Sequence, residues 1–242
     1  MTAPGHFSLA QVQAALFTPG FQFTPQKMAS HLMEAHSQNF EGQHLILGLP
    51  PGAPPNMPRF YLGNDQTRYR LQSTPERVDF FGVSSEVTMP VDVSAALKIA
   101  TEVLCDYAEY GRCVVGRMAC ILAHVLPTEA PGQAIASQFC RRDWVERAFP
   151  RVGDFEVHAH QRLVLQSGLT VNAWIRSKSA VLHSGAGVLA TAVPVIMVEQ
   201  DINTLHEELA KHDFASDVIA SFFEQTVSQA AVMLEESWGE AQ

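Results

Sequence analysis

The sequence predicts the same order of secondary structure twice: a strand, a short helix, an antiparallel meander and a long helix. This order spans residues 7–110 and recurs over residues 112–238. The correspondence lies in order and spacing, not in residue identity. It predicts an α+β fold of pseudo-duplicated units, in which the long helices pack on antiparallel sheet.

Opening strands and short helices occupy corresponding places in the two halves. A strand half-buried on a sheet is expected over residues 7–17, and a more central strand over 113–122, which is rich in apolar and β-branched residues. Thr24 and Pro25 are typical of an N-cap and a first helical residue. A second short helix is expected over the apolar-periodic residues 134–149.

Each half then continues with strand-like segments. These are residues 44–49, 59–62, 67–72 and 78–83 in the first half, and 155–165, 169–177 and 188–198 in the second. The halves are therefore expected to differ by one strand. Pro194 lies inside the last segment and indicates a strand edge or a break. Because a second copy can cover such an edge, a homodimer is one expected assembly.

Two long amphipathic helices are expected to close the halves. After Asp92, which is placed to cap, apolar residues recur at three- and four-residue steps: Ala96, Ile99, Ala100, Val103, Leu104, Tyr107 and Tyr110. The second helix carries an i+4 row: Phe214, Val218, Phe222, Thr226, Ala230, Leu234 and Trp238. Each helix should lie along a sheet, and stripes of this kind are typical of plain core rather than of a cofactor groove.

The halves, residues 1–110 and 111–242, are expected to form one compact pseudo-symmetric unit. The segment Glu109-Tyr-Gly-Arg112 joins a helix to a strand without a Pro- or Ser-rich spacer, so it cannot hold two bodies far apart. The 47% hydrophobic fraction suits a sizeable core, and the 17% charged fraction argues against disorder.

Nothing in the sequence directs the chain to a membrane or out of the cell. Residues 1–5 lack the basic and apolar regions of a signal peptide, and no apolar run approaches the roughly 20 residues that cross a bilayer. The cysteines contain no C-x-x-C pair and are expected to be reduced and mostly buried: Cys105, Cys113, Cys120 and Cys140. A cytoplasmic protein is predicted.

Charge is distributed unevenly along the chain, whose net charge is −9. Residues 201–242 hold nine acids against one base, whereas residues 112–178 hold nine bases against five acids. The basic middle can bind a local anion, but the lack of a broad basic field argues against nucleic acid as a partner. The alternative is a solvated acidic helix with scattered arginines.

The most suggestive polar residues lie on the hairpin of the second half. One face is expected to collect six candidate ligand-binding side chains: His158, His160, Arg162, Trp174, Arg176 and Lys178. If residues 167–169 form a three-residue loop, His160 opposes Arg176 and the polar groups share that face. A two-residue turn would pair His160 with Ile175 and mix polar with apolar side chains. Consistent patterning favours the three-residue loop, with the opposite face packed under the long helices.

This arrangement suits an anion. Imidazole and guanidinium groups beside an indole can hold a phosphate, a carboxylate or a flat anionic ring. The alternative is a solvated sheet face, which needs polar residues in any case. The His158-Ala-His160 spacing also occurs in metal sites, but two ligands are a weak signal, and no metal is predicted.

Other local motifs do not point to catalysis. Ser184-Gly-Ala-Gly187 lies between strands, lacks the Lys-Ser/Thr of a nucleotide loop and indicates a hairpin turn. Residues 49–58 are proline-rich, which favours an extended loop that a partner can grip or a stiff surface excursion. No Gly-x-Ser-x-Gly or His-Glu-x-x-His motif occurs. There is therefore no ground to predict an enzyme, and neither catalytic residues nor a cofactor are assigned.

Several features together resemble a sporadically distributed family of uncharacterised prokaryotic proteins. They are the segment Tyr110-Gly-Arg-Cys-Val-Val-Gly-Arg-Met-Ala-Cys-Ile121 after a long helix, the meander in each half, and Asp201-Ile-Asn203 before the closing helix. Where that family carries Leu-Arg-Tyr-Ile-Asn, this chain has Met118-Ala-Cys-Ile121 after Arg117. The resemblance implies a patchily inherited accessory protein linked to mobile elements or defence. The topology is also similar to duplicated TATA-binding-protein-like and helix-grip folds, which by itself transfers no function.

Two functional hypotheses remain. The first is a non-catalytic binding or assembly subunit of a multicomponent bacterial system, with a protein partner on the sheet face, the proline-rich loop or the acidic C-terminal helix. The second is a ligand-binding or enzymatic domain that takes a small anionic molecule near the 158–178 hairpin. A partner-binding protein should expose an apolar patch rimmed by polar groups, whereas a ligand-binding protein should show a concave pocket with convergent polar groups.

Overall fold

A computed structural model describes residues 6–40, 44–50, 52–63, 69–84, 91–184 and 191–239. The strands are β1 (Ser8–Phe17), β2 (Leu45–Ile46), β3 (Phe60–Leu62), β4 (Tyr69–Ser73), β5 (Arg77–Val83), β6 (Arg117–Pro127), β7 (Glu156–Val164), β8 (Thr170–Ser184) and β9 (Thr191–Thr204). The helices are α1 (Pro25–Ala35), α2 (Val93–Gly111), α3 (Pro131–Phe139), α4 (Arg142–Ala148) and α5 (Ser216–Trp238), with a 3₁₀ turn at His206–Glu208.

The described strands form one antiparallel sheet of nine strands in the order β2-β3-β4-β5-β1-β6-β9-β8-β7. β1 and β6 pair at its centre, with Ala14 opposite Cys120. On either side of this pair lies the strand that precedes a long helix, β5 before α2 and β9 before α5. The α+β class is confirmed, and the sheet runs through both halves. The internal duplication stays a prediction, because matched connectivity alone does not establish it.

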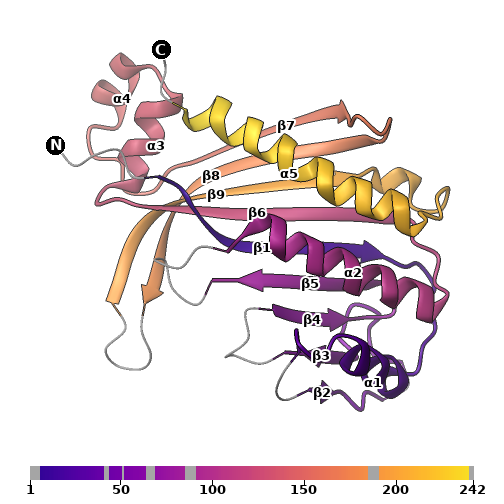
Figure 1. Cartoon of the computed structure of the whole chain (residues 1–242). Coiled ribbons are helices and arrows are strands. Elements are labelled where there is room, and N and C mark those ends of the chain that lie inside the picture. Colours follow the sequence, from indigo (N-terminus) through magenta and orange to yellow (C-terminus); the bar gives the residue numbers. More distant parts are fainter. Residues whose placement is uncertain are drawn as a thin grey trace.

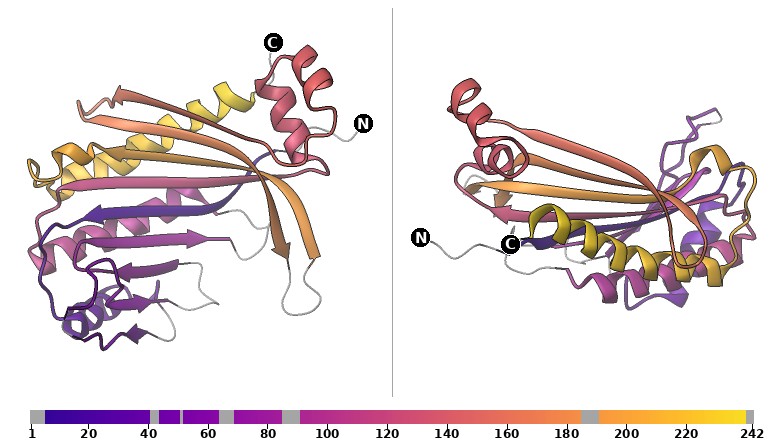
Figure 2. Two further views of the ribbon diagram at one scale, coloured as in Figure 1. Left: turned by 180° about the vertical axis from the view of Figure 1, so that it is seen from behind. Right: turned by 90° about the horizontal axis from the view of Figure 1, so that it is seen from above.

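Helices cover one face of the sheet (Figure 1). α2 packs on β1 and β5, and α5 packs on β6 and β9, so that the two long helices lie side by side. α1 packs beside β2 and β3, and α3 lies at the far end against β7, β8 and β9. Seen from above, the long helices lie on one side of the strands (Figure 2, right). Among the described helices, none is long and apolar enough to cross a membrane.

Local signals in the sequence start α1 and α2 as expected, whereas α3 begins at Pro131, before the expected residue 134. Thr24 is the N-cap of α1 and Pro25 its first residue. Asp92 caps α2, since its carboxylate accepts a hydrogen bond from the Ala95 backbone N–H at 3.0 Å. α2 ends where Arg112 adopts a left-handed conformation with φ 50°. Residues 112–116 are therefore a connection, and β6 begins at Arg117 rather than at the expected Cys113.

The core lies between the sheet and the long helices. Alternate side chains of β1 and β6 are buried there: Val12, Ala14, Leu16, Met118, Cys120 and Leu122. The first strand of the chain is therefore as central in the sheet as β6. α2 buries most of the expected stripe, but Tyr110 is 46% exposed and stacks on His31 instead. The apolar side of the predicted hairpin also faces this core, with Val171 and Ala173 buried.

The second half departs from the expected boundaries in two places. The helix expected over 134–149 is broken into α3 and α4, because Cys140 and Arg141 have extended backbone. β9 runs unbroken past Pro194, which pairs with Val181 of β8 beyond the end of β6. Of the two alternatives for Pro194, the break is wrong. β9 lies between β6 and β8, and the Thr128 N–H just after β6 still donates to the Pro194 carbonyl at 3.1 Å, so β9 has one paired side only beyond this residue. The expected turn at 184–187 lies mostly outside the described residues, between the paired strands β8 and β9.

Candidate functional site

The sheet has a second face on which no described helix packs. Viewed from behind, its strands lie open to the viewer, with α3 and α4 only at one corner (Figure 2, left). Because side chains alternate along each strand, the pairing register places every second residue on this face. We refer to the side chains on this side of β5, β1, β6, β9, β8 and β7 as the open face.

All six predicted site residues lie on the open face. The hairpin pairs His158 with Arg176 and His160 with Trp174, and Arg162 lies opposite Asn172. The expected pairing of His160 with Arg176 is wrong by two residues. Its reason is the turn: Leu165 and Leu169 bond across it, so the three-residue loop is 166–168, one residue earlier than expected, with Gly168 at φ 86°. A shift of two residues preserves the face, so the predicted grouping survives.

Trp174 is the centre of the first cluster on the open face. The His160 ring stacks on it with centroids 4.1 Å apart, and the Arg176 guanidinium lies 5.7 Å from its ring centroid. Arg176 also donates to Glu199 of β9 at 2.8 Å. The cation therefore has its counter-ion within the face, and the indole is held between two polar groups.

The other predicted residues are Arg162 and His158 on β7, which are exposed, and Lys178 on β8, which is half-buried. Arg162 donates to Asn172 at 3.2 Å and to Glu207 at 2.5 Å. His158 lies 2.6 Å from Glu156 of the same strand. Lys178 has no ion pair within the described part of the chain. An exposed surface of paired charges is unlike the concave pocket that the small-ligand hypothesis requires at this place.

A second cluster on the open face was missed by the sequence analysis. The Phe17 ring lies between two guanidiniums, with Arg77 at 4.7 Å and Arg117 at 4.5 Å from its centroid. Arg77 pairs with the buried Asp79 at 2.6 Å, and Gln13 donates to the same carboxylate at 2.8 Å. These residues come from β1, β5 and β6, which are adjacent only in the fold. The one sequence signal was alternation along β1 and β5.

Asparagine side chains connect the two clusters. Arg117 donates to Asn203 at 2.8 Å, and Asn203 in turn accepts from Asn172, next to His160 and Arg162, at 3.4 Å. Burial lowers the pKa of Arg117, and the nearby Asp201 carboxylate opposes that shift. Hydrogen bonds and ring contacts therefore run across the open face from β5 to β7, which fixes the orientation of its side chains.

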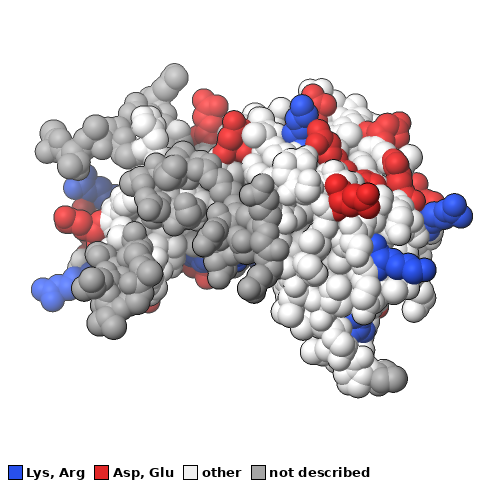
Figure 3. All heavy atoms as spheres, turned by 60° about the horizontal axis from the view of Figure 1, so that its bottom comes forward, with Lys and Arg blue, Asp and Glu red and all other residues white. Residues whose placement is uncertain are grey.

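The two sides of the molecule differ in charge. From β5 to β7 the open face carries five cations, Arg77, Arg117, Arg162, Arg176 and Lys178, against four anions, Asp79, Glu156, Glu199 and Asp201. α2 and α5 carry seven acids, Glu102, Asp106, Glu109, Asp217, Glu224, Glu235 and Glu236, against one base, Lys98. In Figure 3 most of the visible acidic side chains (red) lie toward the upper right, with a few basic ones among them. The open face is therefore nearly neutral, whereas the two long helices are acidic.

Possible metal ligands and cysteine thiols occur in several parts of the described chain. The described residues contain no group of three or more His, Cys, Asp or Glu side chains that could hold a metal ion. The cysteines are free thiols, and burial raises the pKa of Cys113 to about 11 and of Cys120 to about 12. At neutral pH these thiols stay protonated and are poor nucleophiles.

One cluster of titratable groups joins helices rather than lining a site. Asp106 of α2 accepts contacts from His31 at 2.8 Å and His36 at 2.9 Å, both at or just after α1. Tyr110 stacks on His31 with ring centroids 3.8 Å apart. These contacts tie α1 to the C-terminal half of α2, and we assign them a structural role.

Comparison with other proteins adds no function. Neither the protein-family models nor the curated proteins contain a match to this chain. The similarity to a sporadically distributed prokaryotic family therefore stays a prediction.

Proposed function

We propose that this chain is a non-catalytic binding subunit of a multicomponent bacterial system, and that a protein partner docks on the open face. The observation that carries the proposal is the pair of aromatic–arginine clusters, one at Phe17 and one at Trp174. Aromatic and arginine side chains are the residues most enriched at the energetic centres of protein interfaces. A cytoplasmic location belongs to the proposal and accords with free cysteines.

The clusters are suited to a protein rather than to a highly charged partner. Most of their guanidiniums already have partners inside the face, so an incoming surface need not bring matching phosphates. Partly exposed apolar side chains lie on the same side of the strands, among them Phe81, Ile121 and Met197. Rings and aliphatic groups supply apolar area, and the surrounding amides and carboxylates supply hydrogen bonds.

Site-specific photo-crosslinking in the native host tests the proposal. A photoreactive phenylalanine analogue is placed at His158 or Lys178 on the open face, and at Glu102 or Ser228 on the exposed side of the helices. We expect one protein adduct from the open-face positions and none from the helix positions. Trp174→Ala should weaken the open-face adduct by removing the ring on which His160 and Arg176 rest. Adducts from the helix positions alone, or from neither set, would contradict the proposal.

The same experiment distinguishes a second copy from another protein. β7 is an edge strand whose outer side pairs with no described strand, and Val164 on it is 65% exposed. An adduct of twice the chain mass at His158 would identify the partner as a second copy. Adducts of another mass would identify a different protein.

A further inference from the structure

The strongest feature outside the open face is a cavity of about 570 Å³ at the opposite end of the sheet. Its walls come from three segments: the turn from β1 into the start of α1, with Phe21 and Phe23, the proline-rich loop between β2 and β3, and Pro75 in the turn between β4 and β5. Cavities of this size are typical of sites for small organic molecules. The sequence predicts the proline-rich loop either as a segment that a partner binds or as a stiff surface loop. In the structure it forms one wall of the cavity.

The chemistry of the lining is asymmetric. Among the described residues that line it, Arg59 is the single charged side chain and none is a carboxylate, although the chain carries a net charge of −9. Two amides, Gln22 and Gln26, are the other long polar side chains. The rest of the lining is aromatic, aliphatic, proline or glycine, which makes a largely apolar cavity with one cation.

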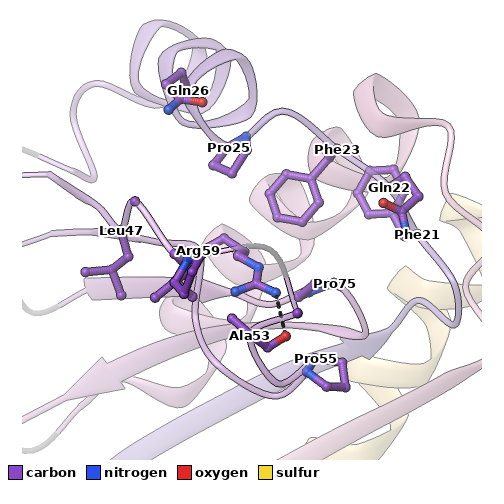
Figure 4. A pocket seen from close by; sticks show the side chains of 14 residues that line it. Phe21, Gln22, Phe23, Pro25, Gln26, Leu47, Ala53, Pro55, Arg59 and Pro75 are labelled. Atoms are coloured by element: carbon purple, nitrogen blue, oxygen red, sulfur yellow. Dashed lines mark hydrogen bonds between the residues drawn. The ribbon is translucent and has the colours of Figure 1, made fainter.

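The Arg59 guanidinium has few hydrogen-bond partners. Its Nη2 donates to the Ala53 carbonyl at 3.5 Å, which is a long bond, and its buried Nη1 has no hydrogen-bond partner. No ion pair to Arg59 occurs among the described residues. The side chain lies in the middle of the lining, between Phe23 and Ala53 (Figure 4). A buried N–H without an acceptor is costly, so an anion entering the cavity gains more here than at an arginine that is already paired.

We propose that this cavity binds a small carboxylate with a flat apolar body, and that Arg59 holds the carboxylate. Because the bond to Ala53 is long, a turn about the terminal torsions of Arg59 brings two N–H groups toward the cavity. Two parallel N–H groups match the two oxygens of one carboxylate. Phe21 and Phe23, whose rings stack with centroids 5.2 Å apart, and the neighbouring prolines then contact the apolar body.

The cavity is separate from the open face, so a ligand can bind there whether or not a protein partner docks. The cavity lies at the β2–β3 end of the sheet, whereas Trp174 lies on β8 near the other edge. The hairpin arginines, Arg162 and Arg176, already form ion pairs, whereas Arg59 forms none with the described residues. Arg59 is therefore a better candidate for binding a small anion than the 158–178 hairpin.

Calorimetric titration of the full chain with 1-naphthylacetate tests the site. We expect saturable binding of one molecule per chain, and at least about tenfold weaker binding of the neutral 1-naphthaleneacetamide, because the amide lacks the charge that Arg59 pairs with. Arg59→Gln should weaken naphthylacetate binding by a similar factor. Arg59→Lys should restore only part of it, since an ammonium lacks the planar pair of donors. Arg162→Gln, on β7, is the matched control and should leave binding unchanged.

Each of the other outcomes overturns the proposal. These are no saturable binding, equal binding of the acid and the amide, or unchanged binding to a folded Arg59→Gln variant. The comparison of acid with amide uses the unaltered chain, so it decides the question even if the variant does not fold. Displacement of naphthylacetate by inorganic phosphate at equal concentration would overturn the choice of a carboxylate.

Discussion

The covered and open faces of this sheet use polar groups in opposite ways. On the covered side, single polar side chains are buried among apolar ones, as when Gln200 donates to the Ala230 carbonyl at 2.6 Å. On the open side, polar side chains gather with aromatic rings and remain in part exposed. Since both faces belong to the same strands, the difference shows which side chains stabilise the fold and which are free to recognise a partner.

We expect substitutions on the two faces to change the free energy of unfolding by different amounts. Substitutions on the covered face should change the free energy of unfolding by several kcal/mol, because they leave cavities or unpaired buried groups. Substitutions of the exposed and half-buried side chains on the open face should change it by less than about 1 kcal/mol, because water replaces what is lost. A large loss of stability from the open face would break the distinction.

Phe222→Ala should produce the largest effect. The ring is fully buried between α5 and the sheet and packs edge-to-face on Phe223 with centroids 5.3 Å apart. Its removal should lower the free energy of unfolding by about 3–5 kcal/mol, measured by urea denaturation. Val232→Ala, on the same helix but 47% exposed, is the control and should cost less than about 1 kcal/mol. Similar losses from both variants would mean that α5 does not pack as described.

His124 should make the covered face sensitive to acid. It lies among α5 residues, its Nδ1 has no partner, and burial lowers its pKa from 6.5 to about 4. Below pH 6.5 the His124 imidazole binds a proton in the unfolded chain, whereas in the folded chain it becomes protonated only near pH 4. The free energy of unfolding therefore falls as pH drops through this range, by about 3 kcal/mol from this group.

His124→Leu should remove that contribution. Urea denaturation at pH 7.5 and pH 4 should show a difference between the two conditions that is smaller by about 3 kcal/mol in the variant. Between pH 7.5 and 9 both proteins should follow the same slope, because His124 is neutral there in both states. An unchanged acid dependence would show that this imidazole is not desolvated.

Tyr107→Phe tests one buried hydrogen bond of the covered face. The phenol is fully buried in α2 and lies 2.8 Å from the Ser73 hydroxyl of β4. Burial raises the pKa of Tyr107, so the hydroxyl stays protonated. Loss of this bond should lower the free energy of unfolding by about 1–2 kcal/mol. Tyr110→Phe, on the exposed side of the same helix, should have almost no effect, and a cost equal to that of Tyr107→Phe would contradict the assignment.

The covered face could largely be predicted from the sequence because its signals are local. Helical spacing located α2 and α5, Asp92 marked the start of α2, and alternation placed the hairpin residues on the correct side. The predicted ends of strands and loops were wrong where another local conformation or hydrogen bond determined them. A left-handed Arg112 delayed β6, and the hairpin loop closed one residue early.

Most of the open face and the whole cavity could not be predicted, because they are built from distant parts of the chain. Arg77 and Arg117 meet at Phe17 only after β1 has paired with both β5 and β6. Arg59 combines a place in the cavity wall with a buried Nη1 that has no hydrogen-bond partner, and no local pattern in the sequence records this combination. The cluster around Trp174 could be predicted because nearly all of its residues lie on two strands that are joined by a short loop.

The Arg176–Glu199 pair should give the smallest effect on stability. Its side chains are 36% and 26% exposed and meet at 2.8 Å, so solvent screens much of their attraction. A double-mutant cycle with Arg176→Gln and Glu199→Gln should yield a coupling free energy of about 0.2–1 kcal/mol in urea denaturation. The same Arg176→Gln variant should nevertheless weaken the open-face crosslink, because it removes the cation beside Trp174. A coupling of several kcal/mol would place the pair with the core, and an unchanged crosslink would remove Arg176 from the recognition surface.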